Sequence, residues 1–208
     1  MNKLDKKVLI FDLDGVIFDS KLNMQLSWQR VQNKYNLYSV SFDKYFNNIG
    51  LPFNKILKKL SIHKNLDDIK KCYDNESIRN INKIKYFGSI LQTLKLLKKR
   101  NYTLAIVTSK DIKRTRKFLK HNEKLFSFIE CHNSKYKGKP HPDQINKIIE
   151  LTKIERKYFV YIGDTNIDYK AAKAAKIDFI FAEWGYGNSY NYKYKLKTTK
   201  DILRNLKK

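Results

Sequence analysis

Four short apolar runs constrain the fold of this chain more than any other feature of its sequence. They cover residues 8–11, 104–107, 159–162 and 179–182, and a weaker fifth run covers residues 126–131. Short runs of this composition are typical of buried parallel strands. Segments with helical periodicity lie between them, such as the one that contains Ile90, Leu91, Leu94 and Leu97. This alternation predicts an α/β fold with a doubly wound, mainly parallel sheet.

The segment 19–83 interrupts the alternation, because it contains only helical patterns. Its apolar residues recur at helical spacing in three groups, which are Met24, Trp28, Val31 and Tyr35, then Phe53, Ile56, Leu57 and Leu60, then Leu66, Ile69 and Tyr73. An all-helical block directly after the first strand of an α/β domain indicates a cap domain. We therefore expect residues 1–18 and 84–208 to form an α/β core domain and residues 19–83 to form a helical cap domain.

Polar residues follow the apolar runs in a regular pattern. In doubly wound sheets, ligands bind where the carboxyl ends of the strands meet the loops. Asp12 and Asp14 follow the first run, Thr108 and Ser109 follow the second, Asp164 and Asp168 follow the run at 159–162, and Lys139 lies between Gly138 and Pro140 in the loop before that run. If the sheet forms as predicted, several carboxylates, a hydroxyl and an ammonium group converge on one crevice.

The carboxylates indicate a site for a hard divalent cation. Taken alone, Asp12 and Asp14 are equally typical of a turn, and Asp164 is equally typical of a helix N-cap. Together in one crevice, they would repel one another and would be costly to desolvate unless a cation neutralised them. Mg²⁺ fits this role, because it binds a few carboxylates together with phosphate oxygens. Asp168 follows Asp164 by four residues on the same helical face, where it can orient the waters of the metal.

Thr108, Ser109 and Lys139 each have a structural and a functional interpretation. The two hydroxyls could cap the helix predicted after them, or they could hold a phosphate oxygen at its start. Lys139 could be one more solvated lysine, or, between Gly138 and Pro140, a fixed cation for a transferring phosphoryl group. The joint occurrence of all these residues, each after its own strand, favours the functional interpretation.

With these residues in place, the sequence resembles the haloacid dehalogenase-like superfamily, and within it the phosphoglycolate phosphatase-like branch with a small helical cap. The resemblance covers nearly the whole chain. The segment 12–16 (Asp-Leu-Asp-Gly-Val) matches the first motif of the family, Thr108 the second, Lys139 the third and the segment 163–168 the fourth. Segments 49–52 and 184–187 are also similar to that branch. One departure is Phe87, which precedes Gly88 where the branch commonly has proline, and it puts no catalytic residue in doubt.

The resemblance implies a phosphoric monoester hydrolase, a phosphatase that acts through an aspartyl-phosphate. Asp12 would be the nucleophile, and Asp14 would protonate the leaving oxygen and then activate water. Thr108 and Lys139 would cradle the phosphoryl oxygens. The substrate would be a small phosphorylated metabolite, such as a sugar, polyol, amino-alcohol or carboxylic acid phosphate.

The resemblance also implies the ligands of the metal and the place of the substrate contacts. Mg²⁺ would be held by the Asp12 carboxylate, by the Asp14 backbone carbonyl and by the Asp164 side chain, with Asp168 in support. The cap would close over the crevice and select the substrate. The candidate substrate contacts are Trp28, Arg30 and residues 49–53 in the cap, beside Ser109 and the loop 184–187 in the core domain. Trp28 also fits the apolar stripe of the cap.

Other functions remain open at this point. A phosphomutase of the same superfamily would keep all four motifs and would return the phosphoryl group to substrate rather than to water. Dehalogenase members lack an acid two residues after the nucleophile, so Asp14 argues for phosphoryl chemistry. A third alternative is a basic module that binds nucleic acid or an acidic partner and carries a vestigial pocket, with an affinity that falls steeply with salt.

The net charge of +24, from 44 basic and 20 acidic residues, comes from lysines scattered over the predicted helices. This distribution indicates a solvated basic surface, so a nucleic-acid partner is not expected. No apolar run approaches the ~20 residues of a membrane span, and the chain starts without a signal-peptide core, so we expect a cytoplasmic location and no membrane partner. Cys72 and Cys131 belong to no metal or disulfide motif. The choice between monomer and homodimer stays open.

Overall fold

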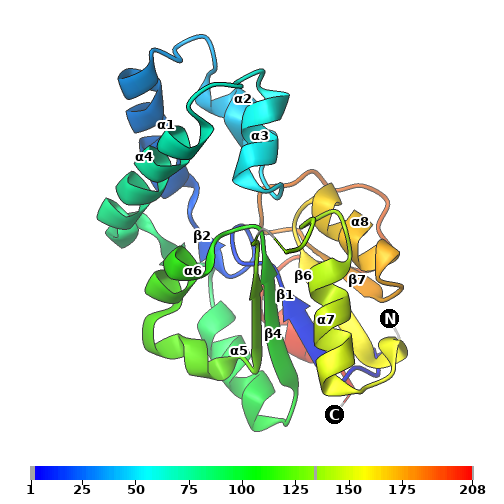
Figure 1. The fold of residues 1–208 in the computed structure, drawn as a ribbon. Coiled ribbons are helices and arrows are strands. Elements are labelled where there is room, and N and C mark those ends of the chain that lie inside the picture. The colour runs from blue at the N-terminus through cyan, green and yellow to red at the C-terminus, as the bar shows by residue number, and fades with distance from the viewer. Residues whose placement is uncertain (1–2, 134, 208) are drawn as a thin grey trace.

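A six-stranded parallel sheet forms the centre of the molecule in a computed structural model, which describes residues 3–133 and 135–207 (Figure 1). The strand order is β5-β4-β1-β6-β7-β8, and each neighbouring pair is parallel. The strands are β1 (Val8–Phe11), β4 (Thr103–Thr108), β5 (Phe128–Cys131), β6 (Phe159–Gly163), β7 (Asp178–Ala182) and β8 (Lys195–Leu196). The predicted α/β fold class with a mainly parallel sheet is therefore confirmed.

Helices cover both faces of this sheet, which explains why its strands are apolar throughout. Successive side chains of a strand point to opposite faces, and in β1 Leu9 and Phe11 belong to one hydrophobic core whereas Val8 and Ile10 belong to the other. The first core also contains residues of α5 (Ile90–Lys99), α6 (Ile112–Leu119) and α9 (Asp201–Asn205), and the second contains residues of α7 (Asp143–Thr152) and α8 (Asn166–Ala174). Two 3₁₀ turns, η2 (Lys120–Leu125) and η3 (Arg156–Tyr158), complete the connections.

The centre of the sheet is also the point where its winding reverses. Strands β4 and β5 lie on one side of β1, whereas β6, β7 and β8 lie on the other. A reversal of this kind opens a crevice at the carboxyl ends of the central strands, which is where α/β proteins bind ligands. The loops after β1, β4 and β6 meet at this crevice.

Four helices between residues 19 and 85 form a second, helical region with a hydrophobic core of its own. They are α1 (Lys21–Tyr35), α2 (Phe42–Phe46), α3 (Phe53–Lys59) and α4 (Leu66–Arg79), and they are followed by the 3₁₀ turn η1 (Ile81–Lys83). They lie beyond one end of the sheet, as the blue and cyan ribbons of Figure 1 show. The chain enters and leaves this region through β2 (Phe18–Asp19) and β3 (Lys85–Tyr86), which pair antiparallel. The two crossings are thereby fixed side by side.

Over residues 3–133 and 135–207, no helix combines the length and the apolarity that crossing a bilayer requires.

Candidate active site

Asp12 and Lys139 form a buried ion pair at the centre of the crevice. Asp12 is the first residue after β1, and its backbone N–H donates to the carbonyl of Ile162 at 2.9 Å. Lys139 Nζ lies 2.8 Å from Asp12 Oδ1 and 2.7 Å from Asp168 Oδ1. Burial raises the pKa of Asp12 to about 7, although Lys139 acts in the opposite direction. Burial alone would lower the pKa of Lys139, but Asp12 and Asp168 outweigh it and raise that pKa, so the lysine stays charged.

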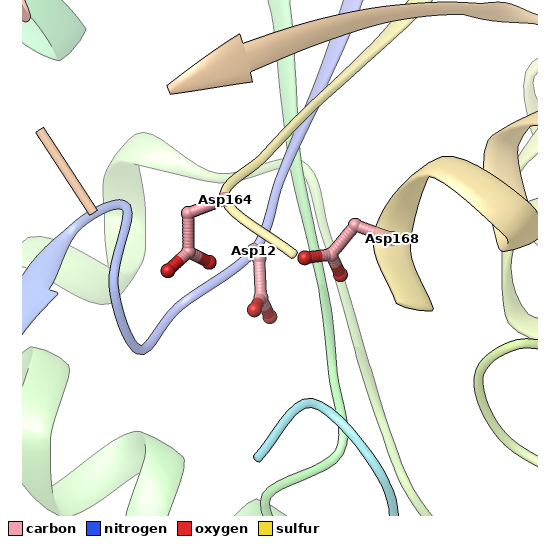
Figure 2. Close-up of side chains that lie close together, drawn as sticks. All are labelled: Asp12, Asp164 and Asp168. Carbon is pink, nitrogen blue, oxygen red and sulfur yellow. The ribbon is translucent and has the colours of Figure 1, made fainter. Parts of the chain in front are cut away.

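Three buried carboxylates converge beside this ion pair, and their arrangement fits a metal ion. Asp12, Asp164 and Asp168 each offer an oxygen within 4.8 Å of the others (Figure 2). Asp164 Oδ2 accepts a hydrogen bond from the Tyr186 N–H at 2.7 Å, whereas Asp164 Oδ1 is buried without a partner. Burial and the neighbouring carboxylates raise the pKa of Asp164 well above its usual value. A hard cation such as Mg²⁺ would remove both the repulsion and the unpaired oxygen.

Asp168 supports the site by holding other groups in place. Its Oδ1 receives the Lys139 ammonium, and its Oδ2 accepts from the N–H and the hydroxyl of Thr165 at 3.0 and 2.7 Å. Thr165 and Asp168 form a capping box at the start of α8. The N-cap of α8 is therefore Thr165, so the alternative interpretation of Asp164 as a helix cap is wrong, and its carboxylate is left facing the crevice.

Two glycines allow the loops to close around Asp164. A Cβ atom on Gly15 would lie 2.1 Å from Asp164 Oδ2, and one on Gly185 would lie 2.3 Å from the Asp164 Cβ. Gly15 also has φ +88°, in the region that favours glycine. Side chains at these positions would displace the carboxylate, so the glycines that follow Asp14 and Trp184 serve the geometry of the site.

Asp14 lines the same crevice as Asp12 but does not belong to the three-carboxylate group. The Ser20 hydroxyl donates to Asp14 Oδ1 at 2.6 Å, and Lys110 Nζ lies 3.0 Å from Asp14 Oδ2. Burial lowers the pKa of Lys110, an effect that Asp14 opposes. The side chain of Asp14 is thus held by two groups of its own and stays separate from Lys139.

Thr108 and Ser109 reach the crevice from the end of β4. Thr108 is buried, and its Oγ1 accepts from the Lys110 N–H at 3.2 Å. The Ser109 hydroxyl donates to the carbonyl of Gly50 at 2.5 Å and so joins this loop to the helical region. The N-cap of α6 is Asp111, whose side chain accepts from the backbone N–H of α6. Neither Thr108 nor Ser109 caps the helix, so the structural interpretation offered by the sequence is wrong for both.

A cavity of about 60 Å³ lies between these residues and the helical region. Thr108, Ser109, Lys110, Arg114 and Lys139 line it on one side, together with the two aspartates of the first motif, and residues of the helical region line it on the other, namely Met24, Tyr45, Ile49, Gly50, Leu51, Phe53, Ile56 and Tyr73. The cavity is therefore lined by two regions of the chain, the helical region and the strand ends of the sheet.

The structure does not bring Trp28 and Arg30 to this cavity, which corrects their assignment as substrate contacts. Trp28 is wholly buried in the helical region, where it stacks on Tyr45 at 4.6 Å and donates from Nε1 to the carbonyl of Val40 at 2.9 Å. Arg30 is exposed and lines a separate surface hollow. Both residues lie on α1, but only its buried face approaches the crevice, through Met24.

Comparison with known proteins gives this site a family. The family model described as haloacid dehalogenase-like hydrolase matches residues 9–182. The chain belongs to this family.

The relatives of this haloacid dehalogenase-like protein are named as phosphatases. The present chain is 26% identical over 183 residues to a phosphoglycolate phosphatase of Aquifex aeolicus, with 86% of each chain covered. It is 24% identical over 205 residues to pyrophosphatase PpaX of Oceanobacillus iheyensis, with 95% of each covered. Among solved structures, a haloacid dehalogenase-like hydrolase from Bacteroides fragilis has a TM-score of 0.87 at 22% identity. The match includes 95% of this chain and 99% of the Bacteroides chain. The predicted family and hydrolase class are confirmed.

Four residues that line the cavity were not recognised from the sequence of this family member. Lys110 directly follows the Thr108-Ser109 pair, and Arg114 lies three residues after Asp111, so their positions in the motif region were a usable signal. Tyr45 and Tyr73 gave no such signal, because they fall on the apolar stripes of their helices and look like core residues.

Proposed function

We propose that this protein is a Mg²⁺-dependent phosphatase that hydrolyses a small phosphomonoester through an aspartyl-phosphate on Asp12, with residues 19–83 as its cap domain. One observation carries the proposal. The carboxylate of Asp12 lies against a buried ammonium, next to a buried carboxylate oxygen without a partner, on the wall of a small cavity. A nucleophile, a fixed cation and oxygen ligands for a metal are the components that phosphoryl transfer requires.

The residues of the site divide the reaction into two displacements. An Asp12 oxygen attacks phosphorus, the bond from phosphorus to the ester oxygen breaks, and Asp14 gives its proton to the leaving alkoxide. In the second step Asp14 takes a proton from water, whose oxygen attacks phosphorus and breaks the bond to Asp12. Inorganic phosphate is released, and the carboxylate of Asp12 and the protonated carboxyl group of Asp14 are regenerated, so protons and phosphoryl oxygens balance.

Lys139 and Thr108 act on the phosphoryl group rather than on the proton. The charged ammonium of Lys139, fixed between two carboxylates, offsets negative charge on the equatorial oxygens. Thr108 offers its hydroxyl from the end of β4, and Ser109 ties this loop to the cap. Mg²⁺, held by Asp12 and Asp164 with Asp14 beside them and Asp168 in support, would supply charge neutralisation for the same oxygens when bound.

The test is phosphate release from small phosphomonoesters by the purified chain, with Mg²⁺ and with chelator. The expected result is release that requires Mg²⁺. Borohydride reduction during turnover should convert the acyl phosphate to homoserine, which mass spectrometry should locate at position 12. Transfer of phosphate to a second sugar phosphate without release would replace the proposal by a phosphomutase, and the absence of both reactions in the folded protein would overturn it.

A further inference from the structure

The two walls of the cavity differ in polarity, and this difference bears on the leaving group of the substrate. The side chains of the cap that line the cavity are apolar or aromatic, namely Met24, Tyr45, Ile49, Leu51, Phe53, Ile56 and Tyr73. None of these lining residues carries a charge. The part of the substrate that lies beyond the phosphoryl group therefore contacts hydrocarbon and aromatic rings.

The cations that line the cavity are all neutralised by carboxylates within the described residues. Lys139 pairs with Asp12 and Asp168 at 2.8 and 2.7 Å. Lys110 pairs with Asp14 at 3.0 Å. With Asp74 and Asp111, the partners of Arg114, these three cations pair with five carboxylates. Asp74 is shared with Lys70.

Arg114 forms an ion pair with the cap, and it has a second carboxylate partner in the core domain. Its Nε lies 2.6 Å from Asp111 Oδ2, and its Nη1 lies 3.0 Å from Asp74 Oδ1 on α4. These two carboxylates raise the pKa of Arg114 although burial acts against them. A second anionic group on the substrate would meet only side-chain cations that already have carboxylate partners among the described residues, and an unpaired charge in a buried site is costly.

The polar atoms that the cap does offer are two phenol groups. The Tyr45 hydroxyl donates to the Tyr73 hydroxyl at 2.9 Å, and no other hydrogen bond of either hydroxyl is found in the described residues. The Tyr45 proton forms the hydrogen bond between the two oxygens, so the Tyr73 hydroxyl proton is left for a further acceptor. Both phenols stay protonated near neutral pH, because burial raises the pKa of Tyr45 and of Tyr73. A hydroxyl or ether oxygen on the substrate would match this donor.

We propose that the substrate is the phosphate ester of a small, uncharged alcohol with a mainly apolar chain and one hydroxyl or ether oxygen, rather than the phosphate of a carboxylic acid or a pyrophosphate. This inference rests on the proposed function. The cavity of about 60 Å³ is small, which favours an alcohol of a few heavy atoms. The protein would then differ in preference from the activities for which the relatives described above are named.

Three esters of nearly equal size separate charge from hydrogen bonding. They are 2-hydroxyethyl phosphate, propyl phosphate and phosphoglycolate, and inorganic pyrophosphate is measured beside them. We expect kcat/KM to be about two- to tenfold higher for hydroxyethyl than for propyl phosphate, the range of one hydrogen bond. We expect phosphoglycolate and pyrophosphate to be lower than propyl phosphate by about a hundredfold or more, because each brings an unpaired charge into the site.

A double variant tests the role of the phenols. In Tyr45→Phe/Tyr73→Phe, the ratio of kcat/KM for hydroxyethyl to propyl phosphate should fall to about one. The ratio is measured within one protein preparation, so a loss of folded protein does not change it. Tyr102→Phe is the matched control, since Tyr102 is buried elsewhere and bonds to the carbonyl of Lys207, and it should keep the wild-type ratio.

Each outcome decides a separate point. Equal or higher kcat/KM for phosphoglycolate or pyrophosphate overturns the inference and leaves the proposed phosphatase intact. If acetyl phosphate, an activated reporter, is the one compound hydrolysed, the inferred substrate class is overturned and the proposed phosphatase activity is kept. A ratio that the double variant leaves unchanged overturns the role of the phenols. The absence of Mg²⁺-dependent turnover with every compound overturns the proposed function, and the inference with it.

Discussion

The sheet side and the cap side of the cavity are built in different ways. On the sheet side, Asp12, Thr108 and Asp164 stand at the ends of β1, β4 and β6, and each is fixed by the backbone ladder of its strand. On the cap side, Tyr45 and Tyr73 come from α2 and α4, and they are held by the packing of helices and by the hydrogen bond between their hydroxyls. Under the proposed function, strand ends would position the reacting groups and helix packing would position the residues that select the substrate. The cap could then change without loss of the reaction.

The largest expected effect is on the sheet side. Asp12→Asn keeps the shape of the side chain but removes the nucleophile, so we expect phosphate release to fall by about a thousandfold or more. Stopped assays with Mg²⁺ and circular dichroism of the same sample measure activity and folding together. Asp178→Asn, the same change at the start of β7, is the control and should keep activity. Retained turnover in Asp12→Asn would remove the nucleophile from the proposal.

Asp14→Asn should have the next largest effect. Asparagine neither gives nor takes the proton, and general acid–base catalysis is worth about a hundredfold or more. Because Asp14 would act in both displacements, pre-steady-state measurements should show that formation and breakdown of the aspartyl-phosphate are both slowed. A rate equal to that of the unchanged protein would exclude Asp14 from proton transfer.

Metal binding should stabilise the sheet side without help from the cap. At a free concentration of 100 times its Kd, Mg²⁺ should raise the free energy of unfolding by about 2.7 kcal/mol, measured by chemical denaturation with and without chelator. Asp164→Asn removes a ligand oxygen and should abolish most of this difference. An equal effect of Mg²⁺ on Asp164→Asn would place the ion elsewhere.

The same carboxylates give the metal-free protein a characteristic pH dependence. Asp12 has a pKa of about 7 in the folded state, above its usual 3.8, so the folded state holds this proton more tightly than the unfolded chain does. The corresponding stability is complete below about pH 4 and is lost as the pH rises through about 7. In chelator, the unfolding free energy of the unchanged protein should therefore fall more steeply between about pH 4 and 7 than that of Asp12→Asn. Parallel profiles would contradict this assignment.

The contrast between the two sides also explains what could be predicted from the sequence. The sequence predicts that Asp12, Thr108 and Asp164 lie close together, because each stands at the end of a short apolar run. In a parallel sheet, the carboxyl ends of such strands lie at the same edge. The strands β2, β3 and β8 were missed, because two residues are too few to show a period. On the cap, Trp28 and Tyr45 lie in the same hydrophobic core, and only packing decides which of them meets the cavity.

Trp28→Phe tests whether this tryptophan serves the cap core alone. The variant loses the hydrogen bond to Val40 and part of the stack on Tyr45, so we expect a loss of about 1–3 kcal/mol in unfolding free energy. The order of preference among the small phosphate esters should stay the same, as measured on the folded fraction. A changed order with little loss of stability would make Trp28 a selecting residue after all.

Arg30→Ala should have the smallest effect. Arg30 is exposed on the outer side of α1, and a substitution at such a position changes stability by about 0.5 kcal/mol or less. Denaturation curves and kcat/KM for each ester should both match the unchanged protein. A selective loss of activity toward one ester would mean that the cap turns its outer face to the crevice during turnover. The apolar lining of the cavity would then belong to only one of two positions of the cap. The substrate class would have to be inferred again from the residues that line the cavity in the second position.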